Sequence, residues 1–141
     1  ASASEWRSSR FLQDAGFADI AKNFLEQNFA NSNLNIDTIA EQIGYSKYHL
    51  CKTFHKQFGI SPMKYLQNLR ISTACKLLIN NPTWTIKKIA HHVGYNNDDY
   101  FCKVFKNLKG ITPNTFRKQS IHYDTLQTIY DFSATKKNTL M

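Results

Sequence analysis

The chain of 141 residues contains the same short unit twice. Residues 36–62 carry the segments IDTIAEQIGY, LCKTF and GISP in that order, and residues 86–113 carry IKKIAHHVGY, FCKVF and GITP. Equivalent positions lie 50 residues apart up to the Gly-Tyr pair and 51 apart after it, so one residue is inserted just past Gly94. A repeat of this kind indicates one supersecondary unit used twice. Each copy has the pattern of a short helix, a tight glycine turn and a second helix.

Apolar spacing and helix-start residues extend this pattern along the chain. Side chains that can cap a helix stand at each expected start: Asn35, Ser46, Ser61, Thr85, Asn96 or Asn97, and Thr112. These caps could also point first-turn N–H groups at phosphates, although simple capping is the more ordinary reading. Helices are expected over residues 19–29, 36–43, 47–58, 62–79 and 86–93, and from residue 97 or 98 to 108, with a short one opening at Pro113 and an amphipathic one over residues 123–130.

The sequence therefore predicts an all-α fold with two helix-turn-helix lobes joined by a long central helix. The expected boundaries are a leader or linker over residues 1–17, a first lobe over 18–61, a connecting helix over 62–80, a second lobe over 81–119 and a C-terminal extension over 120–141.

Composition limits the class of partner. The formal net charge is +8 and the isoelectric point is about 9.5, which favours a polyanion: DNA, RNA or an anionic membrane. No stretch approaches the roughly 18 apolar residues of a membrane span, and no signal peptide is visible. Three cysteines without a CxxC motif indicate reduced thiols and a cytoplasmic location. The chain does not start with Met, so it is expected to be either a stand-alone protein or a fragment of a larger one.

Candidate binding residues of the first unit lie on the helix that follows its glycine turn. Leu50 and Phe54 define the buried side of that helix, and the other positions are candidates for binding: Ser46, Lys47, Tyr48, His49, Cys51, Lys52, His55 and Lys56. Lys52 could donate to guanine or to a phosphate, and Tyr48 could pack on a thymine methyl group. The alternatives stay open, because surface lysines are often only solvated and His49 suits a packing role equally well.

The equivalent helix of the second unit carries two aspartates, Asp98 and Asp99. With Phe101 and Phe105 on the buried side, the candidates are Asn96, Asn97, Asp99, Cys102, Lys103 and Lys106. Asp98 is best read as a helix-start residue, since carboxylates favour the positive end of the helix dipole. Asp99 either does the same or accepts a bond from cytosine N4. Two carboxylates near a polyanion lead us to expect weaker binding by the second unit.

The two units resemble the double helix-turn-helix domain of the AraC/XylS family of transcription regulators. The resemblance covers residues 20–118 and is densest in the run IAHHVGYNNDDYFCKVFKNLKGITPNTFR, residues 89–117. It implies homeodomain-like three-helix units and base contacts at Tyr48, Cys51 and Lys52. It also implies a connecting helix of roughly 27 Å, which could hold two recognition helices in successive major grooves, roughly 34 Å apart.

The family's role implies a cytoplasmic bacterial transcription regulator, usually an activator, whose partner is promoter double-stranded DNA. It further implies contact with RNA polymerase and a separate N-terminal effector or dimerisation domain, for which this chain has no room. The second unit looks most like members that control sugar-utilisation genes. No cofactor is implied.

Other functions fit the residues less well. Cys51 and His55 have metal-ligand spacing, but no second matched pair accompanies them. His91 and His92 point about 100° apart on a helix and share no target, so catalysis is not expected. A DNA-repair protein that shares this module would carry a cysteine-rich metal domain, which this chain lacks. Redox control through Cys51 and Cys102, and membrane binding, are weaker readings. A protein-interaction module is the main alternative, and it would show no salt-dependent DNA affinity.

Overall fold

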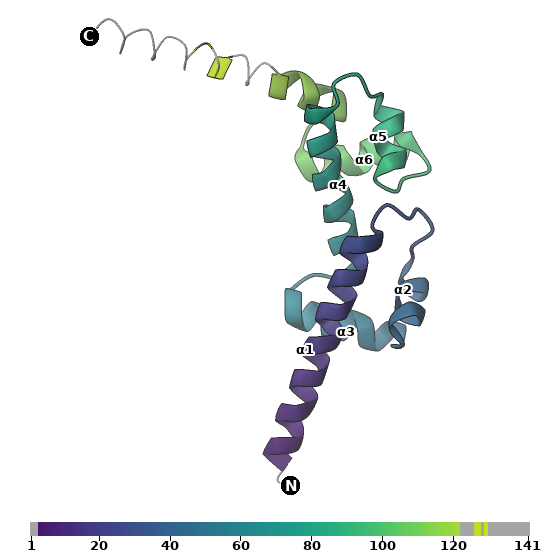
Figure 1. The fold of residues 1–141 in the computed structure, drawn as a ribbon, viewed down its shortest axis with the longest axis vertical. Helices are drawn as coiled ribbons and strands as arrows, with labels where there is room; N and C mark the ends of the chain where they lie inside the picture. Colours follow the sequence, from purple (N-terminus) through teal and green to yellow (C-terminus); the bar gives the residue numbers. More distant parts are fainter. Residues whose placement is uncertain (1–2, 122–125, 128, 130–141) are drawn as a thin grey trace, which may run out of the picture. The chain divides into compact units, whose positions relative to one another are not determined.

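A computed structural model describes residues 3–121, 126–127 and 129, with side chains from residue 16 onward. Most of these residues are helical, and none of them lies in a strand. Figure 1 shows the order of the helices: α1 (Ala3–Asn28), α2 (Ile36–Ile43), α3 (Lys47–Phe58), α4 (Pro62–Asn80), α5 (Ile86–His92) and α6 (Asp98–Lys109). Residues 113–121 form one more helical segment. The predicted all-α fold, with two helix-turn-helix lobes connected by one long helix, is confirmed.

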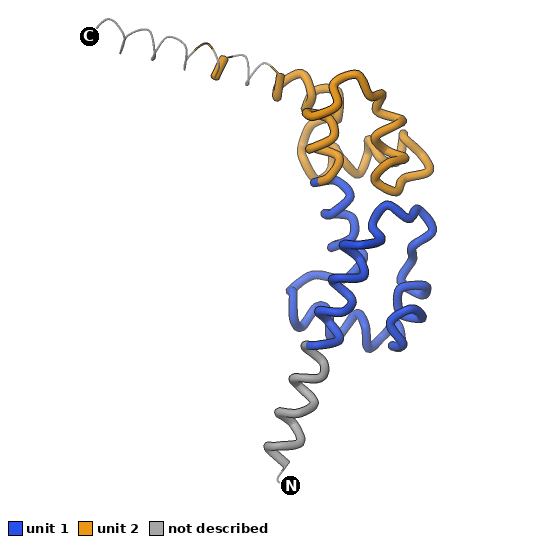
Figure 2. Tube along the Cα trace, in the orientation of Figure 1, with its two compact units in different colours: residues 1–72 blue, residues 73–141 orange. Residues whose placement is uncertain are grey.

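The chain divides into two compact units, residues 1–72 and residues 73–141, which Figure 2 distinguishes by colour. The boundary falls within α4, so this single helix contributes side chains to both units. The first part of α4 places Leu66 in the core of unit 1, and its last part provides Ala74 and Leu78, which are fully buried in unit 2.

Unit 1 is built from three mutually contacting helices, α1, α2 and α3. Its buried core contains side chains from these three helices and from α4: Ala21, Leu25, Ile39, Ala40, Leu50, Phe54 and Leu66. Aromatic rings pack together on the side of this core that faces α4, where the Phe54 and Phe58 ring centroids are 4.7 Å apart. The Tyr65 hydroxyl of α4 donates a 2.6 Å hydrogen bond to a Glu26 carboxylate oxygen of α1.

Unit 2 repeats this arrangement with α5 and α6 in contact. Its fully buried side chains on these helices include Ile89, Ala90, Phe101 and Phe105. The Phe105 ring meets Phe116 of the 113–121 segment edge to face, with centroids 5.5 Å apart. Apolar residues three and four apart on each helix therefore build the core of each unit, as their spacing predicts.

The helix boundaries follow the capping residues. Asn35, Ser46, Thr85 and Asn97 each accept a hydrogen bond from the backbone N–H three residues later. Such a bond satisfies one of the N–H groups that the first turn leaves unpaired. The cap of α6 is Asn97, which resolves the choice between Asn96 and Asn97.

One expectation about the chain ends is revised. Helix α1 begins at Ala3, whereas residues 1–17 were expected to be a leader or linker and the first helix was expected from residue 19. The sequence from Ala3 to Asn28 contains no proline, and helix growth is cooperative, so the packed turns around Ala21 extend towards the N-terminus. The predicted helix over residues 123–130 lies largely outside the described residues, of which 126, 127 and 129 are helical.

Two arginines donate hydrogen bonds to backbone carbonyls near helix ends and so belong to the fold of the two units. Arg70 is buried; its Nε donates to the Phe29 carbonyl at 2.7 Å and its Nη2 to the Asn31 carbonyl at 2.9 Å. Half-buried Arg117 donates in the same way to the carbonyls of Leu78 and Asn81, at 3.1 and 3.4 Å. Each guanidinium thus pairs carbonyls at the end of a helix that intrahelical bonds leave free.

Within the described part of the chain, no helix is both long enough and apolar enough to cross a membrane.

Candidate DNA-binding surfaces

The turn between α2 and α3 depends on Gly44. Its φ of 82° lies in the left-handed region, where a side chain would be strained. The N–H groups of Gly44 and Tyr45 both donate to the Ala40 carbonyl, at 2.9 and 3.0 Å, and so end α2. Ala40 is buried where the two helices meet, so the small side chain and the glycine together fix the direction of α3.

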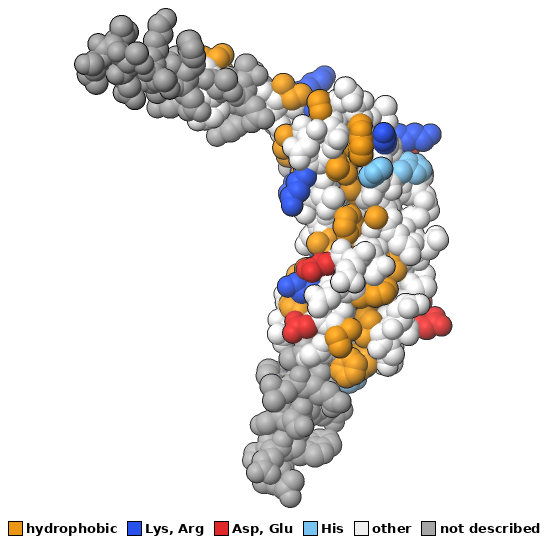
Figure 3. All heavy atoms as spheres, in the orientation of Figure 1, with side chains coloured by type: hydrophobic (Ala, Val, Ile, Leu, Met, Phe, Trp, Pro, Cys, Tyr) orange, Lys and Arg blue, Asp and Glu red, His pale blue; other side chains and the backbone are white. Residues whose placement is uncertain are grey.

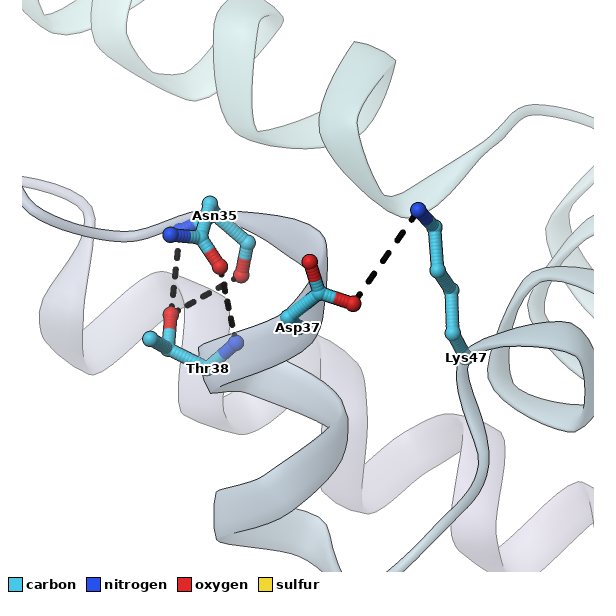
Figure 4. Close-up of polar contacts among 4 residues, drawn as sticks. All are labelled: Asn35, Asp37, Thr38 and Lys47. Atoms are coloured by element: carbon cyan, nitrogen blue, oxygen red, sulfur yellow. Dashed lines mark hydrogen bonds and ion pairs between the residues drawn. The ribbon is translucent and has the colours of Figure 1, made fainter.

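The starts of α2 and α3 lie next to each other, as Figure 4 shows. Asn35 and Thr38 form a reciprocal capping box, in which the Asn35 side chain accepts from the Thr38 N–H at 2.9 Å and Thr38 Oγ1 accepts from the Asn35 N–H at 3.0 Å. The Lys47 ammonium lies 4.0 Å from an Asp37 carboxylate oxygen, and both side chains are exposed. A solvent-exposed ion pair of this kind contributes little to stability.

The outer face of α3 brings most first-unit candidates together. Tyr48, Lys52, His55 and Lys56 are exposed, and Cys51 is half-buried among them. These five residues line one surface hollow of about 670 Å³ together with Ser61, the residue before α4. Because they are spaced three and four residues apart, they form one continuous stripe on the side opposite buried Leu50 and Phe54.

The His49 side chain packs against an aromatic ring. Its ring is half-buried against Tyr45, with centroids 4.3 Å apart, and Tyr45 in turn contacts Phe17 of α1 at 4.1 Å. This arrangement supports the packing role for His49. By contrast, Tyr48 is 76% exposed, and the Lys52 ammonium lies 5.9 Å from its ring centroid. An exposed aromatic ring beside a lysine is a surface that can contact a base edge and a phosphate together.

The turn of the second unit is similar and has one more residue. Gly94 has a φ of 102°, and the Tyr95 N–H donates to the Ala90 carbonyl at 2.9 Å, as the Tyr45 N–H does to Ala40. Asn96 is exposed in the turn, and Asn97 caps α6 by accepting from the Tyr100 N–H at 2.9 Å. The inserted residue is therefore accommodated before α6 without changing how the helix begins.

The outer face of α6 carries the second-unit candidates. Asp99, Lys103 and Lys106 are exposed, and Cys102 is half-buried on the same stripe. Asp98 is half-buried at the first position of the helix, which suits the helix-start role expected for it. The buried side consists of Phe101, Val104 and Phe105.

Burial raises the pKa of the Cys102 thiol, and the carboxylates of Asp98 and Asp99 raise this pKa further. A thiol that stays protonated is a poor nucleophile, so redox control through Cys102 is not favoured. Within the described residues, no group of three or more His, Cys, Asp or Glu side chains could hold a metal ion.

Two residues of these surfaces were not among the sequence candidates. Ser61 lines the hollow beside α3, and Tyr100 is 56% exposed next to Asp99. The repeat could have indicated Tyr100, because it is equivalent to His49 at the 51-residue offset. Ser61 was expected as a cap whose helix start could face a phosphate, and not as a neighbour of α3, since its proximity to α3 depends on how α4 leaves the turn.

Comparison with known proteins agrees with this geometry. A family model described as a helix-turn-helix domain matches residues 39–119. The bifunctional transcriptional activator/DNA repair enzyme AdaA of Bacillus subtilis is 34% identical over 109 residues, which cover 77% of this chain and 51% of AdaA. The arabinose operon regulatory protein of Escherichia coli is 33% identical over 97 residues, which cover 69% of this chain and 33% of that protein.

Among solved structures, the C-terminal domain of AraT, a response regulator from Geobacillus stearothermophilus, superimposes with a TM-score of 0.71 and 29% identity. The match covers 73% of this chain and 84% of that domain. The described helices thus form a helix-turn-helix domain of the kind that DNA-binding transcription regulators carry. The chain belongs to the AraC/XylS family, and it spans about half the length of AdaA and a third of the arabinose regulator.

Proposed function

We propose that this chain activates transcription by placing α3 and α6 in successive major grooves of promoter DNA. The observation that carries the proposal is that both turns end in a helix with the same start, the same buried side and an outward polar stripe. A helix held in this way can enter a major groove, which is wide enough to admit it.

The residues divide by the chemistry of their side chains. Lys52 of α3 and Lys103 of α6 occupy equivalent positions and could donate to guanine or phosphate oxygens. Tyr48 supplies an apolar contact for a thymine methyl group, and Asp99 can accept only from a donor such as cytosine N4. Lys47, His55, Lys56 and Lys106 flank these positions and suit the phosphates on either side.

The wider role is inferred from relatives. The arabinose operon regulator and the regulator of the msm operon of Streptococcus mutans are named for operons, and the former supports control of sugar-utilisation genes. Because the chain spans only part of these relatives, we include an N-terminal effector or dimerisation domain and RNA polymerase among the proposed partners. We place the protein in the bacterial cytoplasm, where the chromosome lies, and we assign this domain no enzymatic activity.

Fluorescence anisotropy tests this function. The chain is titrated into labelled random-sequence duplex DNA at several salt concentrations, and preferred sequences are then selected from a random library. We expect an affinity that falls steeply and linearly in log–log form with salt, because cations bound to the phosphates are released. Selection should return a bipartite site whose halves are about 10 base pairs apart. No binding at low salt would exclude the proposal and favour a protein-interaction module.

A further inference from the structure

The repeat allows the first helix of each helix-turn-helix unit to be compared residue by residue. At the 50-residue offset, α2 and α5 align from Ile36 and Ile86 onward. Both helices bury the same positions, since Ile39 and Ala40 correspond to Ile89 and Ala90. Any difference between the outer faces of α2 and α5 is therefore not required by packing.

The outer face of α5 is basic. It consists of four residues opposite the buried side, all of them exposed: Lys87, Lys88, His91 and His92. Figure 3 shows blue and pale-blue side chains gathered over α5. With the histidines neutral, the formal charge of α5 is +2.

The equivalent face of α2 is acidic. Its residues at the same four positions are Asp37, Thr38, Glu41 and Gln42, and the formal charge of α2 is −2. Figure 3 shows a red side chain over α2 and none over α5. The two helices thus differ by four formal charges, from −2 to +2, on the same structural frame.

The second helices show the opposite trend. Helix α3 has three lysines and no acid, a formal charge of +3, whereas α6 has three lysines and two aspartates, a formal charge of +1. Adding the pairs gives +1 for α2 with α3 and +3 for α5 with α6. In unit 1 one acidic side chain of α2 lies near α3, because the Asp37 carboxylate is 4.0 Å from the Lys47 ammonium.

The α5 face is also held in place by an aromatic ring. The Lys88 ammonium lies 4.3 Å from the centroid of the half-buried Trp84 ring, and the His92 ring lies 4.6 Å from the same ring. At the equivalent positions unit 1 has Leu34, Thr38 and Gln42, which cannot form such a stack. A lysine stacked on tryptophan keeps its charge while losing less conformational freedom when it binds an anion.

We propose that the two units bind DNA through different helices: unit 1 through α3, and unit 2 through the basic face of α5. This inference rests on the proposed function. In helix-turn-helix proteins the first helix crosses the DNA backbone, so Lys87 and Lys88 meet phosphates rather than bases. Helix α6, with Asp99, then contributes selectivity more than affinity.

The proposal replaces the expectation that the second unit binds more weakly. That expectation considered only the two aspartates of α6, whereas the charge that compensates for them lies on α5. Phosphate contacts do not depend on sequence, so removing them should weaken binding uniformly.

The test compares the full chain with the K87Q/K88Q variant in the anisotropy titration, on random duplex DNA and on a duplex selected by the wild-type chain. The matched control is K76Q/K118Q, which removes two exposed lysines of unit 2 that lie outside its helix-turn-helix. Since Lys88 contacts Trp84, the single K87Q variant is measured as well, and circular dichroism checks that each variant folds.

We expect K87Q/K88Q to lower the salt slope by about 1.8, since each phosphate that is no longer neutralised removes about 0.9, and to lower the affinity near 0.1 M salt by roughly 10- to 60-fold. K87Q should show about half of the change in slope. The ratio of affinities for the two duplexes should stay constant. The K76Q/K118Q control should change the slope far less.

Three outcomes would overturn the proposal: an unchanged slope in folded K87Q and K87Q/K88Q, an equal effect of the control variant, or a lost preference for the selected duplex. In each case the wild-type chain would still bind DNA, so the proposed function would stand. Absence of wild-type binding, measured first, would exclude the function itself.

Discussion

At the scale of single residues, buried Arg70 shows how a charged side chain can belong to the fold rather than to the binding surface. Its guanidinium donates to two carbonyls beyond the end of α1. Hydrogen bonds from a charged donor contribute about 1.5–3 kcal/mol each. Without Arg70, the Asn31 carbonyl keeps the Leu34 N–H at 3.3 Å, whereas the Phe29 carbonyl loses the hydrogen bond from Arg70 Nε. We therefore expect Arg70→Ala to reduce the free energy of unfolding by about 2–4 kcal/mol, as measured by urea denaturation.

The control for Arg70 is Lys76→Ala, because Lys76 is an exposed cation on the same helix. Its effect should stay within about 0.5 kcal/mol. Arg70→Lys should recover only part of the stability, since an ammonium lacks the planar fork that reaches two carbonyls. Equal stability of Arg70→Ala and the wild-type chain would contradict the stabilising role of the Arg70 hydrogen bonds.

Tyr65 provides a residue-scale prediction about pH. Burial, followed by the hydrogen bond to Glu26 and its negative charge, raises the pKa of Tyr65 from 10.0 to about 12. The folded chain thus holds this proton more tightly than the unfolded chain. The associated stability is fully present below pH 10 and is lost as the pH rises through 12. In an alkaline absorbance titration, Tyr65→Phe should remove a phenol that ionises near pH 12.

Glu26→Gln tests the cause of this shift. Without the carboxylate, Tyr65 should ionise at a lower pH than in the wild-type chain, although burial should still keep its pKa above 10. If Tyr65→Phe instead removes a phenol that ionises at the ordinary pKa of tyrosine, the raised pKa of Tyr65 is ruled out.

At the scale of helices, local chemistry made most boundaries predictable. Helix α2 spans Ile36–Ile43 as expected, because Asn35 caps its start and Gly44 takes the left-handed conformation at its end. The same reasoning predicts α3 between Ser46 and Gly59. These signals act over three or four residues, so a single sequence contains them in full.

Features that depend on distant residues were not predictable in this way. The two carbonyl partners of Arg70 lie 41 and 39 residues away in sequence, and no local pattern indicates them. The start of α1 was missed because its first turns lack an apolar repeat and follow from continuation of a packed helix. The outward stripe of α3 was predictable from its buried residues Leu50 and Phe54. That Ser61 lines the hollow beside this stripe was not predictable.

Asp99 gives a prediction at the scale of one recognition helix. Its carboxylate is exposed on the outer stripe of α6, where it can accept from cytosine N4 and repels a nearby phosphate. We expect Asp99→Ala to bind random duplex DNA as tightly as the wild-type chain or up to about tenfold more tightly, while losing roughly 1–3 kcal/mol of discrimination at one base pair. Library selection with both chains measures this difference.

Asp98→Ala is the matched control, because the neighbouring carboxylate is half-buried at the helix start. It should cost some helix stability, since the carboxylate no longer interacts with the helix dipole, and leave the selected sequence unchanged. Identical selected sites for Asp99→Ala and the wild-type chain would count against a base-facing Asp99.

At the scale of the whole chain, two units with separate cores each carry one of the proposed DNA-binding surfaces. The charges of these surfaces are distributed differently, with the excess on α3 in unit 1 and on α5 in unit 2. Two moderate surfaces on one chain can reach high affinity together, because the second contact forms within an already bound complex. We therefore expect both units to bind one duplex at the same time.

Lys52→Ala and Lys103→Ala test simultaneous binding, since these lysines occupy equivalent positions on α3 and α6. If both units contact the same duplex, the two decreases in binding free energy should add in the double variant to within about 0.5 kcal/mol. If the units bind alternately, the affinity is the sum of two independent terms. Substitution in the weaker unit alone would then have almost no effect, and its effect would emerge only after the stronger unit is impaired. Anisotropy titration of the four chains on one duplex distinguishes these cases, and we expect additivity.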